Sequence, residues 1–87
     1  MKLKSIRANI DKIDIKIIDM IIKRQSYMPS VGKYKKREGI PIDQKEREIF
    51  ILNKLKKLSS EKKINPKLVE NIFKLIFKDA KSIQKKQ

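Results

Sequence analysis

Two basic side chains fall within an apolar helical pattern in the N-terminal half of the chain. Hydrophobic residues recur at steps of three and four from Leu3 to Val31, as they do on the buried face of a helix. Arg24 and Lys35 take positions of this same series, eleven residues apart. Eleven residues are about three helical turns, so the two cations share one face to within ~20°. That face is the one we expect to be buried.

A buried guanidinium and a buried ammonium require an anionic partner. Burying either cation without a counter-charge is costly, and the series offers no nearby acid because Asp14 and Asp19 lie closer to the outer face. Two interpretations stay open. Either Arg24 and Lys35 each pair with Glu46 or Glu48 of the next helix, or the counter-charge is a ligand. A small dianion held inside the bundle would suit Arg, whose fork binds a carboxylate bidentately.

Other polar residues fall near the inner faces of later segments. In "KEREIFIL", Arg47 and Glu48 precede the apolar run, so at least one of them leans inward unless both are surface charges of a first helical turn. Gln84 lies one turn after Ala80 on an inner face and can donate to a ligand oxygen. The alternative for Gln84 is a solvated position near the end of the chain.

Arg7 lies near the start of the same first helix, 17 residues before Arg24. That spacing is about 25 Å along a helix, so the two cannot touch one small ligand within one chain. In an antiparallel dimer, Arg7 of one subunit would approach Arg24 of the other.

The composition excludes several kinds of chemistry. The 87 residues include no Cys and no His, which excludes disulfides, Ser–His and Cys–His nucleophiles and His-ligated metals. We expect no metal and no cofactor. The net charge of +14, from 24 Lys and Arg against 10 Asp and Glu, favours an anionic partner: nucleic acid, a membrane surface or an acidic small molecule. A solvated, Lys-rich surface would also account for it.

The sequence predicts one domain, residues 1–87, with no signal peptide and no apolar run long enough to span a membrane. We therefore expect a cytoplasmic protein without a membrane partner.

Three helices are expected to carry these residues, in an all-α fold. The first runs from about Ser5 to Glu38, where Gly39 suits a left-handed cap. The second begins at Asp43, three residues before Glu46, in a variant of the capping box. The third begins at "NPKLVE", with the Asn as N-cap and the Pro at the first helical position.

Pro29 lies inside the first predicted helix, between its two cations. A proline there removes one hydrogen bond and usually kinks the helix. We expect a kink at Pro29, with Gly32 easing the local backbone and Lys35 still reaching the pocket.

The first helix is too long for its own domain. It would extend roughly 50 Å at the standard rise, whereas a compact chain of this length is about 30 Å across. Its apolar face can be buried only by another chain, which predicts a homodimer of interlocked helices.

Together these residues form a family signature. "VGKYK", "GIPI", "ERE" and "FKLIFKDAKSIQ", with Arg7 and Arg24 spaced as above, closely resemble the all-helical (AroQ-type) chorismate mutases. The resemblance runs from about Ile6 to Gln84. It implies an intertwined dimer and an isomerase reaction, the Claisen rearrangement of chorismate to prephenate on the shikimate route to phenylalanine and tyrosine, with no cofactor.

The resemblance also implies roles for individual residues. Arg24 and the partner subunit's Arg7 would hold the two carboxylates of chorismate. Lys35 and Gln84 would donate to the ether oxygen, which gains negative charge as its bond breaks. A pericyclic reaction needs no nucleophile or proton shuttle, which suits a chain without His or Cys; it needs a restrained conformer and donors aimed at developing charge.

Further positions follow from the same comparison. Glu48 would accept from the ring hydroxyl, and Arg47 would line the pocket. Gln44 stands where the family commonly has Asp, with an acid one residue earlier at Asp43. Ala80 stands where Ser is frequent, so one hydroxyl contact is missing. By the same resemblance, Gln44 and Ala80 would contact the substrate.

Three alternatives to the mutase stay open on the sequence. An isochorismate-pyruvate lyase has the same fold, although the intact "GKYK" and "ERE" favour the mutase. A basic helical nucleic-acid binder would explain the charge. Against it, Arg24 and Lys35 face inward, and the 2 Tyr and 3 Phe form no stacking platform. An inactive or regulatory scaffold would fit the changes at Gln44 and Pro29.

Overall fold

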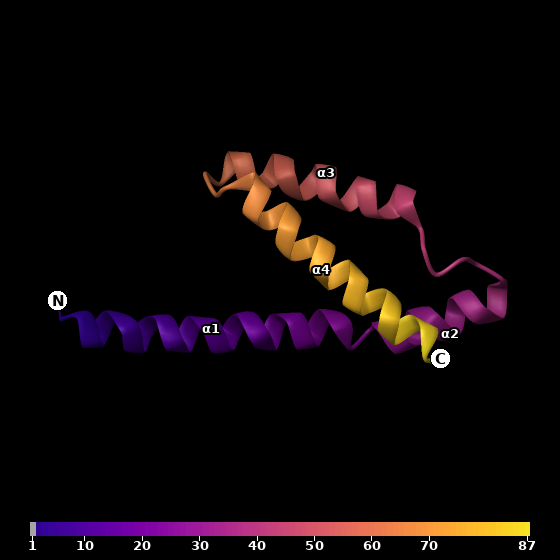
Figure 1. Cartoon of the computed structure of the whole chain (residues 1–87), viewed down its shortest axis with the longest axis horizontal. Helices are drawn as coiled ribbons and strands as arrows, with labels where there is room; N and C mark the ends of the chain where they lie inside the picture. Colours follow the sequence, from indigo (N-terminus) through magenta and orange to yellow (C-terminus); the bar gives the residue numbers. More distant parts are fainter. Residues whose placement is uncertain (1) are drawn as a thin grey trace.

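The structure, a computed structural model, describes residues 2–87, and these residues form helices joined by turns and loops, with no strand. The helices are α1 (Leu3–Gln25), α2 (Met28–Glu38), α3 (Lys45–Glu61) and α4 (Pro66–Lys85). α1 and α2 together make up the long first helix predicted from the sequence, and α2 continues in about the direction of α1 (Figure 1). The prediction of an all-α fold with one long and two shorter helices is confirmed, with the long helix bent.

The bend lies just before Pro29. α1 ends at Gln25, and Ser26 and Tyr27 form a turn before α2 begins. Pro29 has no N–H to donate to the carbonyl of Gln25, four residues earlier, and its ring crowds that carbonyl. Ser26 Oγ also donates to the carbonyl of Lys23 at 2.6 Å, a local bond that competes with the helix. The predicted kink is confirmed, but the helix is interrupted before the proline rather than at it.

Gly32 has a different role from the one expected. It lies inside α2, is buried, and does not have the positive φ that would demand a glycine. A Cβ at Gly32 would lie 2.7 Å from the carbonyl oxygen of Gln84 and 2.8 Å from its Cα. The expectation that Gly32 eases the backbone at the kink is therefore wrong, because this glycine lets α4 approach α2.

Two of the predicted helix ends are confirmed. Gly39 follows α2 with a φ of 67°, the left-handed conformation that glycine adopts without a steric penalty. The side chain of Asn65 accepts a hydrogen bond from the backbone N–H of Lys67 at 3.0 Å, so Asn65 caps α4 and Pro66 is its first residue.

The predicted start of α3 is wrong by one residue. The N-cap is Gln44, and it makes no side-chain capping bond. Asp43, one residue earlier, pairs with α4 instead, since its Oδ1 lies 3.3 Å from the ammonium of Lys81. A pairing between distant segments therefore replaces the local cap.

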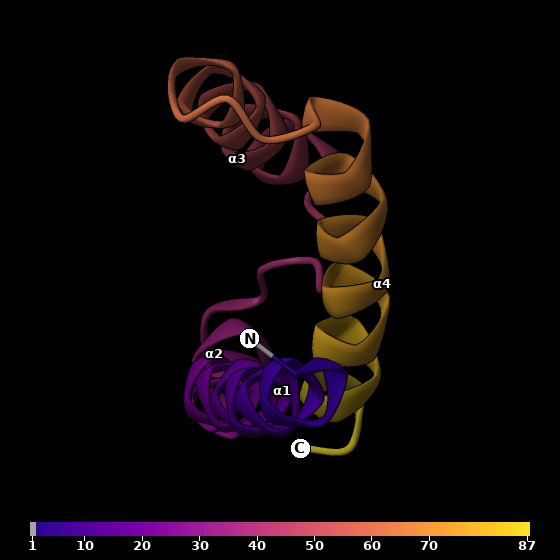
Figure 2. The same ribbon diagram turned by 90° about the vertical axis from the view of Figure 1, so that its left-hand side faces the viewer.

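α4 packs against both α3 and α2, whereas α1 extends beyond them (Figures 1 and 2). The molecule is 56 Å long with a radius of gyration of 16.2 Å, against about 12 Å for a compact chain of this length. The predicted overshoot of the first helix is confirmed. No described helix is long and apolar enough to cross a membrane.

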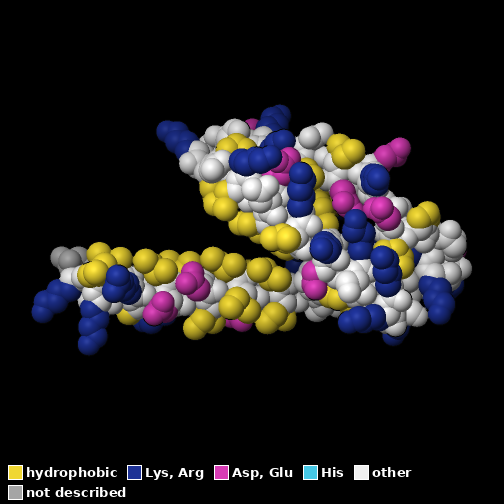
Figure 3. All heavy atoms as spheres, in the orientation of Figure 1, with side chains coloured by type: hydrophobic (Ala, Val, Ile, Leu, Met, Phe, Trp, Pro, Cys, Tyr) yellow, Lys and Arg dark blue, Asp and Glu magenta, His cyan; other side chains and the backbone are white. Residues whose placement is uncertain are grey.

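The hydrophobic side chains of α1 are exposed along two of its edges (Figure 3). Ile6, Ile10, Ile13 and Ile17 follow one edge, and a second series on the opposite side consists of Ile15, Ile18 and Ile22. Among the described residues, the buried apolar core contains only Ile76, Phe77 and Ala80, all on α4. In the single chain most of the apolar surface of α1 is therefore uncovered.

Candidate active site

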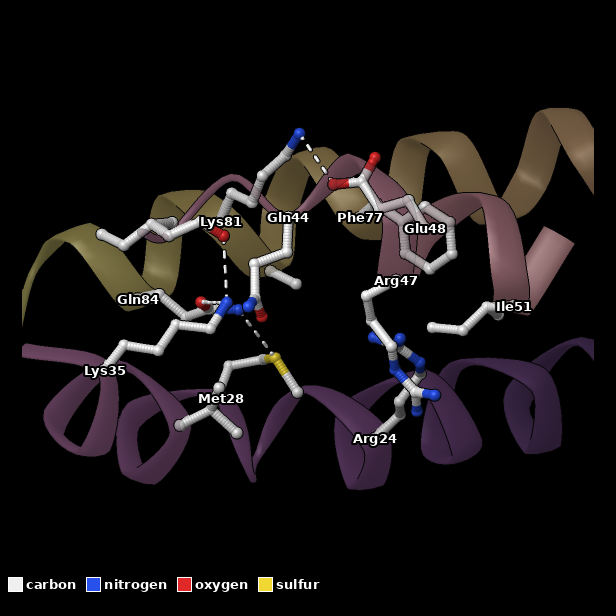
Figure 4. Close-up of a pocket in the computed structure, with 13 residues that line it drawn as sticks. Arg24, Met28, Lys35, Gln44, Arg47, Glu48, Ile51, Phe77, Lys81 and Gln84 are labelled. Carbon is white, nitrogen blue, oxygen red and sulfur yellow. Dashed lines mark hydrogen bonds and ion pairs between the residues drawn. The ribbon is translucent and has the colours of Figure 1, made fainter. Parts of the chain in front are cut away.

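A pocket of about 230 Å³ lies where α2, α3 and α4 meet the C-terminal end of α1 (Figure 4). Each of the four helices and the loop before α3 contribute to its wall, with charged and amide groups set among apolar side chains. It is lined by Arg24, Met28, Val31, Lys35, Ile42, Gln44, Arg47, Glu48, Ile51, Phe77, Ala80, Lys81 and Gln84.

All the site residues predicted from the sequence, except Arg7, line this pocket. Arg7 is exposed near the start of α1, far along the helix from the pocket. The structure brings the other predicted residues together, while the role of each in binding or catalysis stays a prediction.

Lys35 is buried on α2 and has two partners. Its Nζ donates to Oε1 of Gln84 at 2.8 Å and to the carbonyl of Ile42 at 2.9 Å. An ammonium has three N–H donors, so one remains for a ligand. Burial lowers the pKa of Lys35 below its usual value, although the carboxylates of Glu48 and Asp43 act in the opposite direction. A bound anion would relieve this penalty.

Gln84 is buried, with 6% of its surface exposed, so the alternative of a solvated residue near the chain end is wrong. Its Oε1 accepts from Lys35, and its Nε2 lies 3.4 Å from the sulfur of Met28. A thioether is a weak acceptor. The amide N–H groups are therefore available to a stronger acceptor in the pocket.

Among the residues that the structure describes, Arg24 has no acidic partner. Its Nη1 donates to Oε1 of Gln25 at 2.7 Å, and its guanidinium carbon lies 5.6 Å from the centre of the Phe77 ring. Within the described part of the chain, neither Glu46 nor Glu48 forms a salt bridge with it. The interpretation that one of these glutamates supplies the counter-charge is therefore wrong.

The guanidinium groups of Arg24 and Arg47 approach each other across the pocket (Figure 4). Burial lowers the pKa of Arg24, and the charge of Arg47 lowers it further. Arg47 likewise makes no salt bridge with an acid of residues 2–87; its guanidinium lies over the Phe50 ring at 5.5 Å. Two neighbouring cations without a counter-charge among the described residues favour the binding of an anion between them.

The sequence did not predict two polar residues, Lys81 in the pocket wall and Gln25 behind Arg24. Lys81 lines the pocket, and its Nζ lies 3.0 Å from Oε2 of Glu48 and 3.3 Å from Oδ1 of Asp43. The hydrogen bond to Glu48 is the main cause of a raised pKa at Lys81. Its position three residues before Gln84, on an adjacent part of the helix face, was an available signal. Nothing in the sequence around Gln25 predicts its contacts with α4.

Comparison with known proteins places the chain in a family. A family model described as chorismate mutase type II matches residues 6–85. The chain belongs to the chorismate mutase type II family. A chorismate mutase of Methanocaldococcus jannaschii is 37% identical over 84 residues, which are 97% of this chain and 85% of that protein. The all-helical family suggested by the sequence motifs is thereby confirmed.

Other relatives match this chain over only part of a longer protein. The T-protein of Haemophilus influenzae is 34% identical over 90% of this chain, which spans only 21% of that protein. A bifunctional chorismate mutase/prephenate dehydratase of Buchnera aphidicola subsp. Schizaphis graminum is 31% identical over 97% of the chain and 22% of its own length. The comparison with solved structures found no significant match.

The charged side chains that line this pocket are mostly cationic. Among the described residues, no group of three or more acidic side chains lies close enough together to hold a metal ion. The groups that converge on the pocket are instead the ammonium of Lys35, the guanidinium groups of Arg24 and Arg47, and the amide of Gln84.

Proposed function

We propose that this chain rearranges chorismate to prephenate in the pocket between α2, α3 and α4. Membership of the chorismate mutase type II family supports this activity and does not favour the lyase or the nucleic-acid binder. The observation that carries the assignment to this pocket is that Arg24 and Arg47 meet there without an acidic partner from residues 2–87, beside the hydrogen-bonded pair of Lys35 and Gln84. A dicarboxylate supplies the missing negative charge.

The reaction breaks the ether C–O bond of chorismate while a new C–C bond forms within the same molecule. Arg24 holds one carboxylate and so restrains the flexible side chain of the substrate near its reactive conformer. Lys35 and Gln84 donate to the ether oxygen, whose negative charge grows in the transition state. Because these donors are already fixed to one another at 2.8 Å, little reorganisation is needed as that charge develops.

The remaining predicted residues complete the pocket. Glu48, held by Lys81 at 3.0 Å, accepts a hydrogen bond from the ring hydroxyl. Arg47 adds positive charge beside Arg24, and Gln44 contacts the substrate from the start of α3. Ala80 offers only a methyl surface.

The second carboxylate is bound by Arg7 of the partner subunit in a homodimer. Two features support this arrangement: the pocket lies far from Arg7 of the same chain, and α1 exposes isoleucines on two opposite edges. A second copy that covers α1 would bury this apolar surface, which is the main driving force for stable association. The single domain over residues 1–87 and the cytoplasmic location expected from the sequence stay predictions.

The activity is tested by the loss of chorismate absorbance with purified protein. Arg24→Ala should lower kcat/KM at least about a hundredfold, because it removes a charged contact in a buried site. Lys23→Ala, which removes an exposed neighbouring cation, is the matched control and should resemble wild type. Turnover of the wild type no faster than that of Arg24→Ala would refute the mutase. Release of pyruvate from isochorismate would indicate the lyase instead.

The shared site is tested by mixing two inactive variants. In a dimer of Arg7→Ala with Arg24→Ala, one site has both arginines and the other has neither. After unfolding and refolding together, the mixture should recover about a quarter of wild-type activity, since half of the dimers are mixed and each has one intact site of two. No recovery, or a fully active monomer in sedimentation, would contradict the shared site.

A further inference from the structure

Gln25, the last residue of α1, is buried and fully hydrogen-bonded. Only 8% of its surface is exposed. Its Nε2 donates to the carbonyl of Ile76 at 3.0 Å and to Oδ2 of Asp79 at 3.1 Å, both on α4. Its Oε1 accepts from Nη1 of Arg24 at 2.7 Å. Because both amide hydrogens are engaged on α4, the direction of the amide oxygen is fixed by a helix distant in sequence.

The guanidinium of Arg24 is therefore held from two sides. The amide oxygen of Gln25 binds one nitrogen, and the Phe77 ring lies 5.6 Å from the guanidinium carbon. This restraint opposes the repulsion from Arg47. A guanidinium has five N–H donors, so one bond to Gln25 leaves the others for a carboxylate.

An amide suits this position better than a carboxylate. A carboxylate beside Arg24 would neutralise it and compete with an anionic ligand for the same donors. It would also lie against the carboxylate of Asp79 without an N–H to donate. Glutamine holds the arginine in place while leaving its full charge to the ligand.

We propose that Gln25 is a positioning residue, which the Ile76 carbonyl and the Asp79 carboxylate hold in place so that it aims the Arg24 guanidinium at a substrate carboxylate. The kinetic part of this inference rests on the proposed function, whereas the geometric part concerns the free protein. No pocket residue is replaced in testing it, because Gln25 and Asp79 do not line the pocket.

The kinetic experiment compares three variants with the wild type, one at Gln25 and two at Asp79. Gln25→Met keeps a similar volume but removes all three hydrogen bonds, and it should raise KM about tenfold with a smaller change in kcat, because a misdirected arginine binds ground state and transition state less well. Asp79→Ala removes one restraint on the amide and should raise KM about threefold. Asp79→Asn keeps an acceptor for Gln25 and should restore the wild-type KM.

Ser59→Ala is the control for a purely structural effect. It removes a buried hydroxyl that bonds the carbonyl of Leu55 at 2.6 Å near the far end of α3, and it should lower Tm without changing KM. If Gln25→Met behaves in the same way, with a lower Tm and a KM within twofold of wild type, the proposal is overturned while the mutase assignment stands.

A second measurement does not depend on turnover. In the ligand-free protein, ¹⁵N NMR should resolve separate Nη signals for Arg24 because its rotation is hindered, and Gln25→Met should average them. Equal signals in the two proteins would overturn the positioning role. If the wild type proves inactive on chorismate, the proposed function fails, and this NMR comparison still decides whether Gln25 holds Arg24.

Discussion

The side chains of Lys35 and Gln84 meet at 2.8 Å although 49 residues separate them in the sequence. They belong to α2 and α4, whose backbones come into close contact at Gly32, one turn before Lys35. The positions of the two donors proposed to act on the ether oxygen thus depend on this crossing of α2 and α4, which has no room for a side chain at position 32. The packing of the two backbones and the proposed catalytic geometry therefore depend on the same glycine.

Gly32→Ala is expected to destabilise the protein and to slow the reaction. The added Cβ would lie 2.7 Å from a backbone oxygen of Gln84, which cannot swing aside, so the helices must separate. Overpacking of this kind costs about 1–3 kcal/mol. Thermal unfolding should show a lower Tm, and kcat should fall because Lys35 and Gln84 move apart. Lys33→Ala, on the exposed side of α2, serves as the control. An unchanged kcat in Gly32→Ala would show that the close approach of α2 and α4 at Gly32 is not needed for catalysis.

Activity should be lost at high pH as Lys35 loses its proton. Because burial lowers the pKa of Lys35 in the free protein, the basic limb of kcat/KM should lie below the ordinary lysine value of 10.5. A bound dianion favours the ammonium, so the limb of kcat should lie at higher pH than that of kcat/KM. Lys35→Arg should remove the basic limb of the pH profile, however slow that variant is. Lys36→Arg should keep the limb. A limb that survives Lys35→Arg would mean that another group titrates.

Lys81→Met is expected to raise KM a few-fold and to move the basic limb upward. Without its ammonium, Glu48 and Asp43 lose the partner that holds them at 3.0 and 3.3 Å. The charge of Lys81 also lowers the pKa of Lys35, so its removal raises that pKa. Lys81→Arg should restore much of the wild-type behaviour, since a guanidinium can pair with both carboxylates. The pH profile of kcat/KM checks the shift, and a limb that stays in place in Lys81→Met would contradict it.

Glu70 should stabilise the fold in a pH-dependent way, far from the pocket. Hydrogen bonds from Lys67 and Lys56, at 3.0 and 3.2 Å, lower its pKa from 4.5 to about 2. A carboxylate with a depressed folded-state pKa contributes stability above its unfolded pKa, and this contribution is lost as the pH falls from 4.5 towards 2.

Comparison of Glu70→Gln with wild type tests this contribution. The wild type should have the higher Tm at neutral pH, and the difference should shrink towards zero near the folded-state pKa of about 2. Added salt should also reduce the difference, because the partners are partly exposed. Glu61→Gln replaces an exposed acid on α3 that forms no salt bridge with the described residues, and it should show little difference. A Tm difference that is the same at every pH would exclude the carboxylate as its cause.

The sequence predicted those features that follow from local chemistry. Spacing alone placed Arg24 and Lys35 on one face, and capping preferences placed Gly39 and Asn65 at helix ends. Pro29 predicted a kink because its missing N–H acts on a residue only four positions away.

The features that were missed depend on how distant segments meet. Gln25 reaches Ile76 across 51 positions, and Lys81 reaches Asp43 across 38. No periodicity within a helix encodes these distances, because they depend on how α4 crosses its neighbours. The same limit explains the wrong cap at Asp43, where a preference for a local bond was overridden by a charge on another helix. Gly32 was misjudged for the same reason, since its neighbour is a backbone atom of α4.

The exposed isoleucines of α1 also affect how much active protein accumulates in a cell. A chain that has not yet associated with a second copy exposes two hydrophobic edges of α1. Chaperones bind exposed hydrophobic surface of this kind, and proteases degrade chains that expose it. On the proposed assembly, newly made chains are protected only once paired. The level of active enzyme would then rise more steeply than the rate of synthesis, so that modest changes in expression are amplified into larger changes in flux.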